Sequence, residues 1–160
     1  MVALSAKTHA QATASATATA TIVAPIAISK TVDLNFGNVA VIASGTVVLA
    51  PADGTRTKTG GVTLPSTIGT VTAASFDVTG EGVYTYAITL PSSDYTITRV
   101  GGTETMAVNV FKSYPDVADN GALTAGAQTL KVGATLNVGA GQVAGTYTNA
   151  TGFDVTVNYN

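Results

Sequence analysis

Hydrophobic and polar positions alternate with a period of two along most of this chain. The clearest case is the segment 152–160, where four large apolar residues occupy every second position: Phe153, Val155, Val157 and Tyr159. Successive side chains of a β-strand point to opposite faces of a sheet, so this pattern is typical of a half-buried strand. We therefore expect the strongest strand of the chain here, with those four side chains pointing inward.

A second alternating stretch lies near the N-terminus, in residues 13–24. Small residues alternate there with hydroxyl-bearing ones, so an extended chain would place one small, apolar set on a single face: Ala14, Ala16, Ala18, Ala20, Ile22 and Ala24. Threonine at alternate positions disfavours a helix because it is β-branched, and Pro25 ends whatever element precedes it. The pattern predicts an extended arm over residues 13–28.

Shorter alternating runs bounded by Gly, Pro, Asn and Asp predict further strands at 31–37, 45–50, 56–58, 69–80, 83–90, 95–100 and 103–111. Turn-forming residues 91–94 lie between two Tyr/Ile/Thr-rich runs and predict a hairpin of 83–90 with 95–100. The pair Gly60 and Gly61 is expected to break a strand. In 69–80 the expected inward set is Thr72, Ala74, Phe76 and Val78.

The stretch 130–134 is echoed by 136–140, which predicts a pair of strands with similar alternation. A β-helix coil is the alternative, but two copies are too few to bury a core. Strands at intervals of roughly 8–12 residues, without helical periodicity, favour an all-β fold. We expect an immunoglobulin-like antiparallel β-sandwich over residues 29–160, without the Cys pair and Trp of antibody domains.

Residues 1–12 are interpreted as the remnant of a signal peptide. Ala10, Gln11 and Ala12 fit a small-x-small cleavage site, although the Ala/Thr run supplies other such triplets and a flexible start is the alternative. The expected location is accordingly outside the cell.

Composition narrows the classes of partner. The chain is 46% hydrophobic and only 10% charged, which argues against disorder. Its seven Lys and Arg residues are scattered, so no basic stripe for nucleic acid is formed. No apolar run reaches the roughly 18 residues of a membrane-spanning helix. We expect neither a nucleic-acid partner nor a transmembrane segment.

The sequence offers no constellation for catalysis. It has no cysteine, and its single histidine, His9, lies in the predicted signal remnant, so neither a catalytic triad nor a multi-His metal site can form. Asp77 and Glu81 form a pair of carboxylates without an aromatic platform. An acidic loop matches no EF-hand spacing and suits turn formation better than calcium: Asp116, Asp119 and Asn120. We expect no catalytic, cofactor or metal site, and no enzyme activity.

The two ends of the chain are complementary, because one offers small alternating residues and the other large ones. An open sheet edge can accept a strand from a neighbouring chain, and head-to-tail donation generates an open filament. The alternative is that residues 13–28 form the first strand of their own sandwich.

Several motifs together resemble a bacterial family known as domain of unknown function forty-four-oh-two. They are ATIVAPIAI at 20–28, DLNFG at 33–37, GV at 61–62, ASF at 74–76, LKVGATLNVG at 130–139, GTY at 145–147 and VTVNY at 155–159. The likeness covers almost everything after Thr17. It implies a secreted protein with a signal peptide and no particular activity.

A looser resemblance is to chaperone–usher pilins and spore coat protein U-like subunits. In these proteins an incomplete immunoglobulin-like domain is completed by a neighbour's N-terminal arm, and Tyr159 is penultimate as the aromatic is in their last strand. These proteins also carry a glycine near the start of that strand. In this chain Gly145 and Gly152 lie on either side of the expected position.

The looser resemblance implies a head-to-tail homopolymer, a pilus-like fibre on the bacterial cell surface that serves adhesion and biofilm, assembled with a periplasmic chaperone and an outer-membrane usher. The arm would be the polymerisation segment, and Phe153, Val155, Val157 and Tyr159 the acceptor strand. The alternative function is a stand-alone secreted module that binds glycans or surface partners, most plausibly through residues 114–121.

Overall fold

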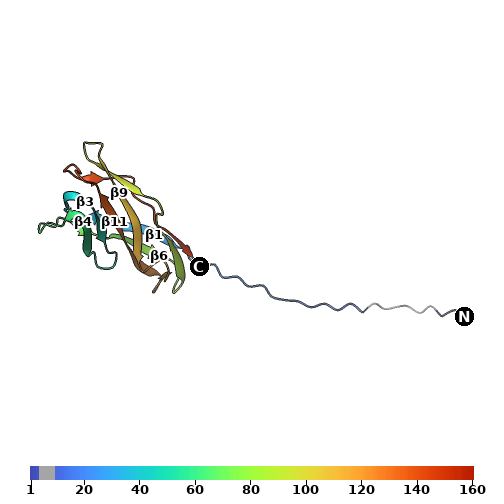
Figure 1. The fold of residues 1–160 in the computed structure, drawn as a ribbon. Coiled ribbons are helices and arrows are strands. Elements are labelled where there is room, and N and C mark those ends of the chain that lie inside the picture. The colour runs from blue at the N-terminus through green and yellow to red at the C-terminus, as the bar shows by residue number, and fades with distance from the viewer. Residues whose placement is uncertain (4–9) are drawn as a thin grey trace.

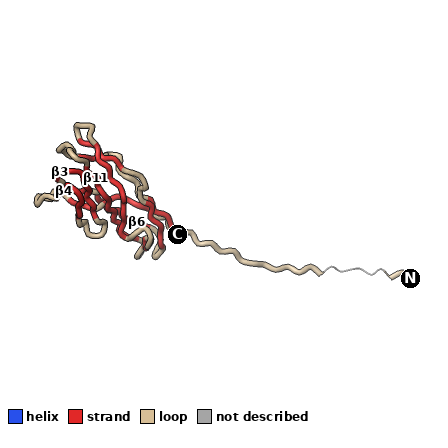
Figure 2. Tube along the Cα trace, viewed as in Figure 1, coloured by secondary structure: helices blue, strands red, loops and turns tan. Residues whose placement is uncertain are grey.

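The computed structural model describes residues 1–3 and 10–160, and this part of the chain is all-β, without a helix (Figures 1 and 2). The strands in chain order are β1 (Ala27–Val32), β2 (Asn35–Phe36), β3 (Ala40–Leu49), β4 (Arg56–Thr63), β5 (Val71–Thr72), β6 (Ala74–Thr79), β7 (Thr85–Thr89), β8 (Tyr95–Arg99), β9 (Thr105–Tyr114), β10 (Gly121–Ala122), β11 (Ala127–Val138), β12 (Tyr147–Thr148) and β13 (Thr156–Tyr159). In the described residues no helix is long and apolar enough to cross a membrane.

The fold is an antiparallel β-sandwich whose sheets curl into a half-barrel, which confirms the predicted fold class. The main sheet has the order β1-β6-β11-β9-β8-β12, with β3 also beside β11 and β4 beside β3. Strand β11 organises this sheet. One of its edges pairs first with β6 and then with β3, and its other edge pairs with β9.

A smaller sheet, β10-β7-β13, forms the second layer, and β2 pairs with β5 in a short ribbon. The core lies between the layers. Strand β11 shows why, because every second side chain is large or apolar and buried: Leu130, Val132, Ala134, Leu136 and Val138. Each methylene group that these side chains bury contributes about 0.8 kcal/mol to the stability of the fold. The inward face predicted for 69–80 is confirmed for Ala74, Phe76 and Val78, which are also buried.

The predicted hairpin of 83–90 with 95–100 is wrong. Strand β7 pairs with β10 and β13 in the small sheet, whereas β8 pairs with β9 and β12 in the main sheet. Residues 91–94 therefore carry the chain from one layer to the other. Turn-forming residues determine where a strand ends but not which strand it pairs with. Here β7 and β8 bury their apolar side chains from opposite layers of the sandwich.

The two similar stretches 130–134 and 136–140 were expected to be two strands, but residues 127–138 form one continuous strand. Gly133 continues the strand because the backbone of a neighbour passes close by, and a Cβ there would lie 2.1 Å from the carbonyl oxygen of Leu49. The predicted break at Gly60 and Gly61 is wrong for a similar reason. Both glycines lie inside β4, where Gly60 pairs with Gly45 of β3.

The segment 152–160 was expected to be the strongest strand, but β13 contains only four residues. Residues 152–155 stay outside the ladder. Gly152 adopts a positive φ of 77°, which turns the chain, and Phe153 is held by aromatic rings from β6, β8 and β9 rather than by a neighbouring strand.

Residues 10–26 extend away from the sandwich, and the C-terminus lies close to the point where they leave it (Figure 1). Strand β1 begins at Ala27, so the last two residues of the arm expected over 13–28 belong to the sandwich. Residues 10–26 belong to no strand. Of the predicted signal remnant, residues 4–9, including His9, lie outside the described residues.

Candidate functional site

The arm contacts its own sandwich only at its base. The side chains expected to form its polymerisation face are all exposed and belong to no sheet: Ala14, Ala16, Ala18, Ala20, Ile22 and Ala24. Ile22, the largest of them, is 93% exposed. The arm therefore presents a full edge of backbone donors and acceptors to solvent.

Three residues, here called the arm clamp, hold the base of the arm: Ala24, Glu81 and Tyr159. The Ala24 N–H donates to a Glu81 carboxylate oxygen at 3.0 Å, and the Tyr159 hydroxyl donates to the Ala24 carbonyl at 2.9 Å. The same hydroxyl accepts the Glu81 N–H at 2.6 Å. Because Glu81 lies in the turn after β6 and Tyr159 ends β13, the clamp ties the arm to both layers.

Small and aromatic neighbours shape the clamp. A Cβ at Gly80 would lie 2.2 Å from the Tyr159 hydroxyl oxygen, so glycine is needed there. The Tyr84 ring lies against that of Tyr159, with centroids 5.5 Å apart. The Tyr159 hydroxyl is thereby fixed in place to receive the Ala24 carbonyl.

Two strand edges next to the clamp are open. Strand β1 pairs only with β6 and β13 only with β7, so each has one edge with no partner among the described residues. Strand β4 is also at an edge, but it carries Arg56 and Lys58, which is a common protection against unwanted strand pairing. Strand β13 carries no charged residue, and its unpaired edge is chemically suited to accept a strand.

The residues expected to form the acceptor strand all pack on the core. Val157 is buried, and Phe153, Val155 and Tyr159 are half-buried against the core. Phe153 is at the centre of an aromatic group, with its ring centroid 4.8 Å from that of Phe111 and 5.7 Å from that of Tyr95. The structure brings the arm and this strand together only at Ala24 and Tyr159.

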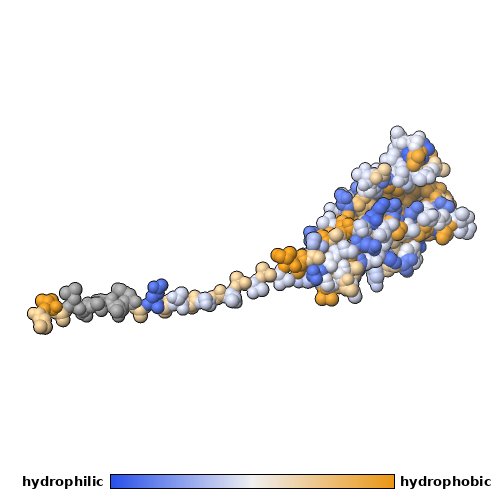
Figure 3. Space-filling view, turned by 180° about the vertical axis from the view of Figure 1, so that it is seen from behind, coloured by the Kyte–Doolittle hydropathy of each residue, from blue (hydrophilic) through white to orange (hydrophobic). Residues whose placement is uncertain are grey.

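Among the described residues, eighteen hydrophobic side chains are buried in the core, while fourteen more pack against it but stay only half-buried. We call these fourteen the open rim: Ile26, Ile28, Leu34, Val39, Val41, Leu64, Val71, Leu90, Tyr95, Ile97, Met106, Phe153, Val155 and Tyr159. Figure 3 shows apolar surface along the body of the domain as well as at the base of the arm.

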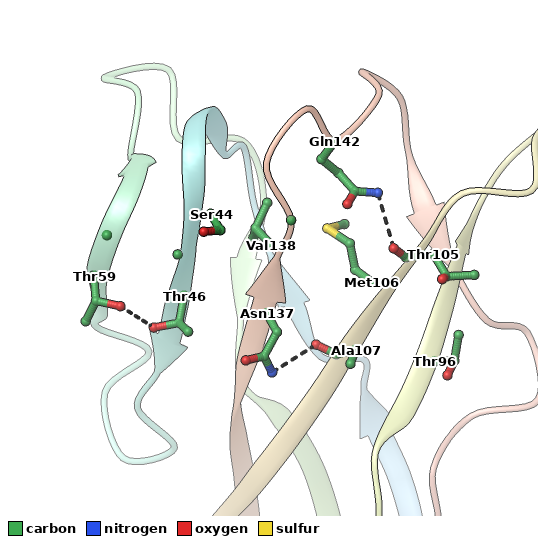
Figure 4. A pocket seen from close by; sticks show the side chains of 13 residues that line it. Ser44, Thr46, Thr59, Thr96, Thr105, Met106, Ala107, Asn137, Val138 and Gln142 are labelled. Carbon is green, nitrogen blue, oxygen red and sulfur yellow. Dashed lines mark hydrogen bonds between the residues drawn. The ribbon is translucent and has the colours of Figure 1, made fainter.

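A shallow pocket lies on the outer face of the main sheet, where β3, β4, β8, β9 and β11 bring hydroxyls and amides together (Figure 4). Most of these groups already bond to one another. Thr46 and Thr59 share a hydrogen bond of 2.7 Å across strands, and Asn137 donates to the Ala107 carbonyl and the Asn109 side chain. None of the lining residues is acidic, basic or a histidine, so the pocket offers no general acid or base.

The acidic residues considered for catalysis or metal binding have structural partners. Asp77 accepts a hydrogen bond from Thr129 on the neighbouring strand, and the Glu81 carboxylate belongs to the arm clamp. Asp116 accepts the N–H of Ala118, which is the bond of an Asx turn. Within residues 1–3 and 10–160, no group of three or more His, Cys, Asp or Glu is placed to hold a metal ion.

The family model described as Domain of unknown function (DUF4402) matches residues 26–159. The chain belongs to this family. The membership confirms the resemblance found in the sequence motifs, but the matched span begins at Ile26, later than the likeness expected from Thr17 onward. Searches of curated proteins and of solved structures gave no match.

The DUF4402 match thus coincides with the sandwich and leaves the arm outside it. Sequence reasoning missed the role of Glu81 at the base of the arm and treated that residue only as one half of a carboxylate pair. No sequence signal identifies it, because Glu81 and Ala24 are 57 positions apart. The other two clamp residues, Ala24 and Tyr159, were both among the residues expected to take part in polymerisation.

Proposed function

We propose that this DUF4402 protein is a structural subunit of an extracellular filament assembled by donor-strand exchange. Residues 14–24 of one copy add as a strand beside β13 of the next copy. The observation that carries the proposal is the coexistence, in one chain, of an unpaired extended arm and an open, half-buried strand edge. The arm lacks a strand to pair with, and the open edge of β13 lacks a neighbouring strand.

Backbone and side chains both support strand addition. An added strand gains main-chain hydrogen bonds to the edge, while alternate side chains enter the sandwich. The arm offers alanines and one isoleucine on one face and mostly threonines on the other. Because the open rim already contains large residues such as Phe153 and Tyr159, the small inward side chains of the arm suit the remaining space.

Local geometry at the clamp favours donation to another copy over folding back. To lie beside its own β13, the arm would have to reverse direction at Ala24, immediately before β1. The residue that precedes a proline prefers extended backbone, and Ala24 precedes Pro25. The hydrogen bonds from Glu81 and Tyr159 also hold Ala24 where the arm leads away from the body (Figure 1).

The remaining steps of the proposal concern export. The proposal includes a periplasmic chaperone that covers the open rim before assembly and an outer-membrane usher that exchanges the chaperone for an arm. The product is a fibre on the bacterial surface that serves adhesion and biofilm formation.

The test is deletion of residues 13–24, followed by electron microscopy and size-exclusion chromatography of the purified protein. The parent chain should form fibres, and the deletion variant should be a folded monomer with a β-rich circular dichroism spectrum. A synthetic peptide of residues 13–24 should bind the deletion variant. Fibres formed by the deletion variant would contradict the proposal.

A matched pair of substitutions tests the predicted faces of the arm. Ala18→Asp places a charge on the face that enters the neighbour and should prevent fibre formation, because an unpaired charge cannot be buried. Thr17→Asp places the same charge on the opposite face and should leave fibres intact. Equal effects of the two variants would mean that the arm does not insert as a strand.

A second candidate function is the stand-alone binding module for glycans or surface partners. It is favoured by the exposed apolar side chains of Tyr114 and Val117, in the segment 114–121 that the sequence singled out. This function predicts that the deletion variant binds a glycan array as a monomer and that Tyr114→Ala abolishes the binding. Absence of binding by the monomer would remove this candidate.

A further inference from the structure

The sandwich has two distinct ends, which strand direction defines. One end, the arm pole, contains the arm clamp, the turn after β6 and the end of β13. The start of β11 lies there too, because the Gly126 N–H donates to the Gly82 carbonyl in that turn. Strand β11 then runs to the other end, the far pole. This pole contains residues 99–104, between the antiparallel strands β8 and β9, and the segment 139–146.

The far pole is held together by contacts between its segments. The Val100 N–H donates to the Thr146 carbonyl, and Ser44 and Gly45 line the same pocket as Gln142. Residues 42–45 of β3 therefore lie at this end as well, consistent with the pairing of Gly45 with Val138 at the end of β11.

Both poles expose apolar side chains. At the arm pole Val83 is 81% exposed, beside the partly exposed ring of Tyr84. At the far pole Ile42 is 86% and Val100 62% exposed, and Val143 lies exposed in the adjoining segment. Single exposed apolar residues are ordinary, but here they occur at the two ends that a head-to-tail chain would bring together.

The length of the arm brings those ends into contact. Residues 13–24 match the twelve residues of β11, so an inserted arm would run along most of a neighbouring sandwich. Between Ala24 and β1 there are only Pro25 and Ile26, which span at most about 7 Å. With the arm inserted as far as Ala24, the two domains have no spacer and must touch.

The direction of insertion decides which ends touch. Strand β13 ends at the arm pole, as shown by the bonds of Tyr159 in the clamp. An arm that runs antiparallel to β13 therefore leaves the neighbour at its far pole, and repetition gives an open filament. A parallel arm would leave at the neighbour's arm pole, so that two copies would exchange arms and close as a dimer.

We propose that the arm pole of one copy packs on the far pole of the next, with the donated arm antiparallel to β13 and Val83 and Tyr84 seated against Ile42, Val100 and Val143. The partner is a second copy of this chain. This inference rests on the proposed function and adds to it the polarity and the second contact surface of the filament.

Engineered cysteines test the contact directly, because the chain has no cysteine of its own. Three double variants combine Val83→Cys with Ile42→Cys, Val100→Cys or Val143→Cys, and are assembled into fibres and treated with a short bismaleimide. At least one should give a ladder of covalent oligomers on a denaturing gel. The combination of Val83→Cys with Val110→Cys, which is exposed in the middle of β9 and outside both poles, is the matched control and should give none.

The outcomes separate this inference from the proposed function. Fibres that form but give no ladder with any of the three pairs overturn the pole contact and leave strand exchange standing. Covalent dimers from Val83→Cys alone overturn it in favour of reciprocal exchange. If the parent chain forms no fibres at all, the proposed function itself fails.

Discussion

The arm at residues 13–24 and strand β11 have the same length, yet one is solvated and the other is the most central strand of the fold. Both alternate an apolar with a more polar face. Strand β11 pairs along both edges with β3, β6 and β9. The arm pairs with nothing among the described residues and is held only at Ala24.

The difference lies in the size of the inward side chains. The inward set of β11 contains two leucines and two valines around one alanine, whereas that of the arm contains alanines and one isoleucine. Burial of a methylene contributes about 0.8 kcal/mol, and ordering one residue of backbone costs about 1–2 kcal/mol. An alanine strand cannot build a layer for itself, so it requires an edge and a rim that are already in place.

The largest expected effect is loss of a buried side chain from β11. Leu130→Ala should lower the free energy of unfolding by about 2–5 kcal/mol, because Leu130 is fully buried and the cavity would be only partly filled. The control in the arm, Ile22→Ala, should change monomer stability by less than about 0.5 kcal/mol. Urea unfolding monitored by circular dichroism measures both. A comparable loss for Ile22→Ala would mean that the arm packs on its own domain.

The next effect concerns close backbone packing in β11. Gly133→Ala should cost about 1–3 kcal/mol, because the new Cβ would meet the Leu49 carbonyl oxygen at 2.1 Å and must displace backbone. Ala16→Gly in the arm is the reciprocal control and should leave the urea midpoint unchanged. A neutral Gly133→Ala would show that β3 and β11 separate easily, in conflict with their continuous pairing.

Comparison of the two regions also shows what the sequence could predict. Period-two patterning identified the all-β class, the inward faces of β6 and β13, and the extended state of the arm. It failed where pairing depends on distant residues. The run 130–140 was expected to form two strands because its second half repeats the pattern of its first, whereas the structure has one strand in which Gly133 lies against the backbone of Leu49.

The sequence likewise predicted only part of the candidate site. Alternation of small residues marked the arm, and alternation of large residues marked 153–159. The contact that joins them could not be predicted, because Glu81 becomes a clamp residue only when the turn after β6 meets the end of β13. Strand partners such as those of β7 and β8 likewise depend on which layer buries each apolar face.

A smaller effect is expected at the clamp, where the two regions meet. Tyr159→Phe removes the hydroxyl that accepts from Glu81 and donates to Ala24, but keeps the ring against Tyr84. The expected loss is about 0.5–1.5 kcal/mol, the net contribution of an ordinary hydrogen bond. Amide hydrogen exchange should become faster at Glu81, with β11 unaffected. Unchanged exchange at Glu81 would contradict the clamp.

The smallest expected effect is a pH dependence of the stability of the sandwich, in which the arm takes no part. The hydrogen bond from the Arg99 side chain holds the pKa of Glu104 below its ordinary value of 4.5, so this carboxylate stabilises the sandwich above that value, and the stabilisation is lost as the pH falls through the lowered pKa. The two side chains are 26% and 34% exposed to solvent, which keeps the contribution small. The arm at residues 10–24 contains no titratable side chain.

Glu104→Gln should therefore lower the urea midpoint slightly at neutral pH, and the difference from the parent should disappear in acid. Asp53, whose pKa is lowered by hydrogen bonds from Thr55, is present in both proteins and cancels in the comparison. Binding of the arm peptide to the deletion variant should be the same for both proteins at neutral pH, because Glu104 lies at the far end of the sandwich from the clamp. A difference that persists in acid would show that Glu104 acts through packing rather than charge.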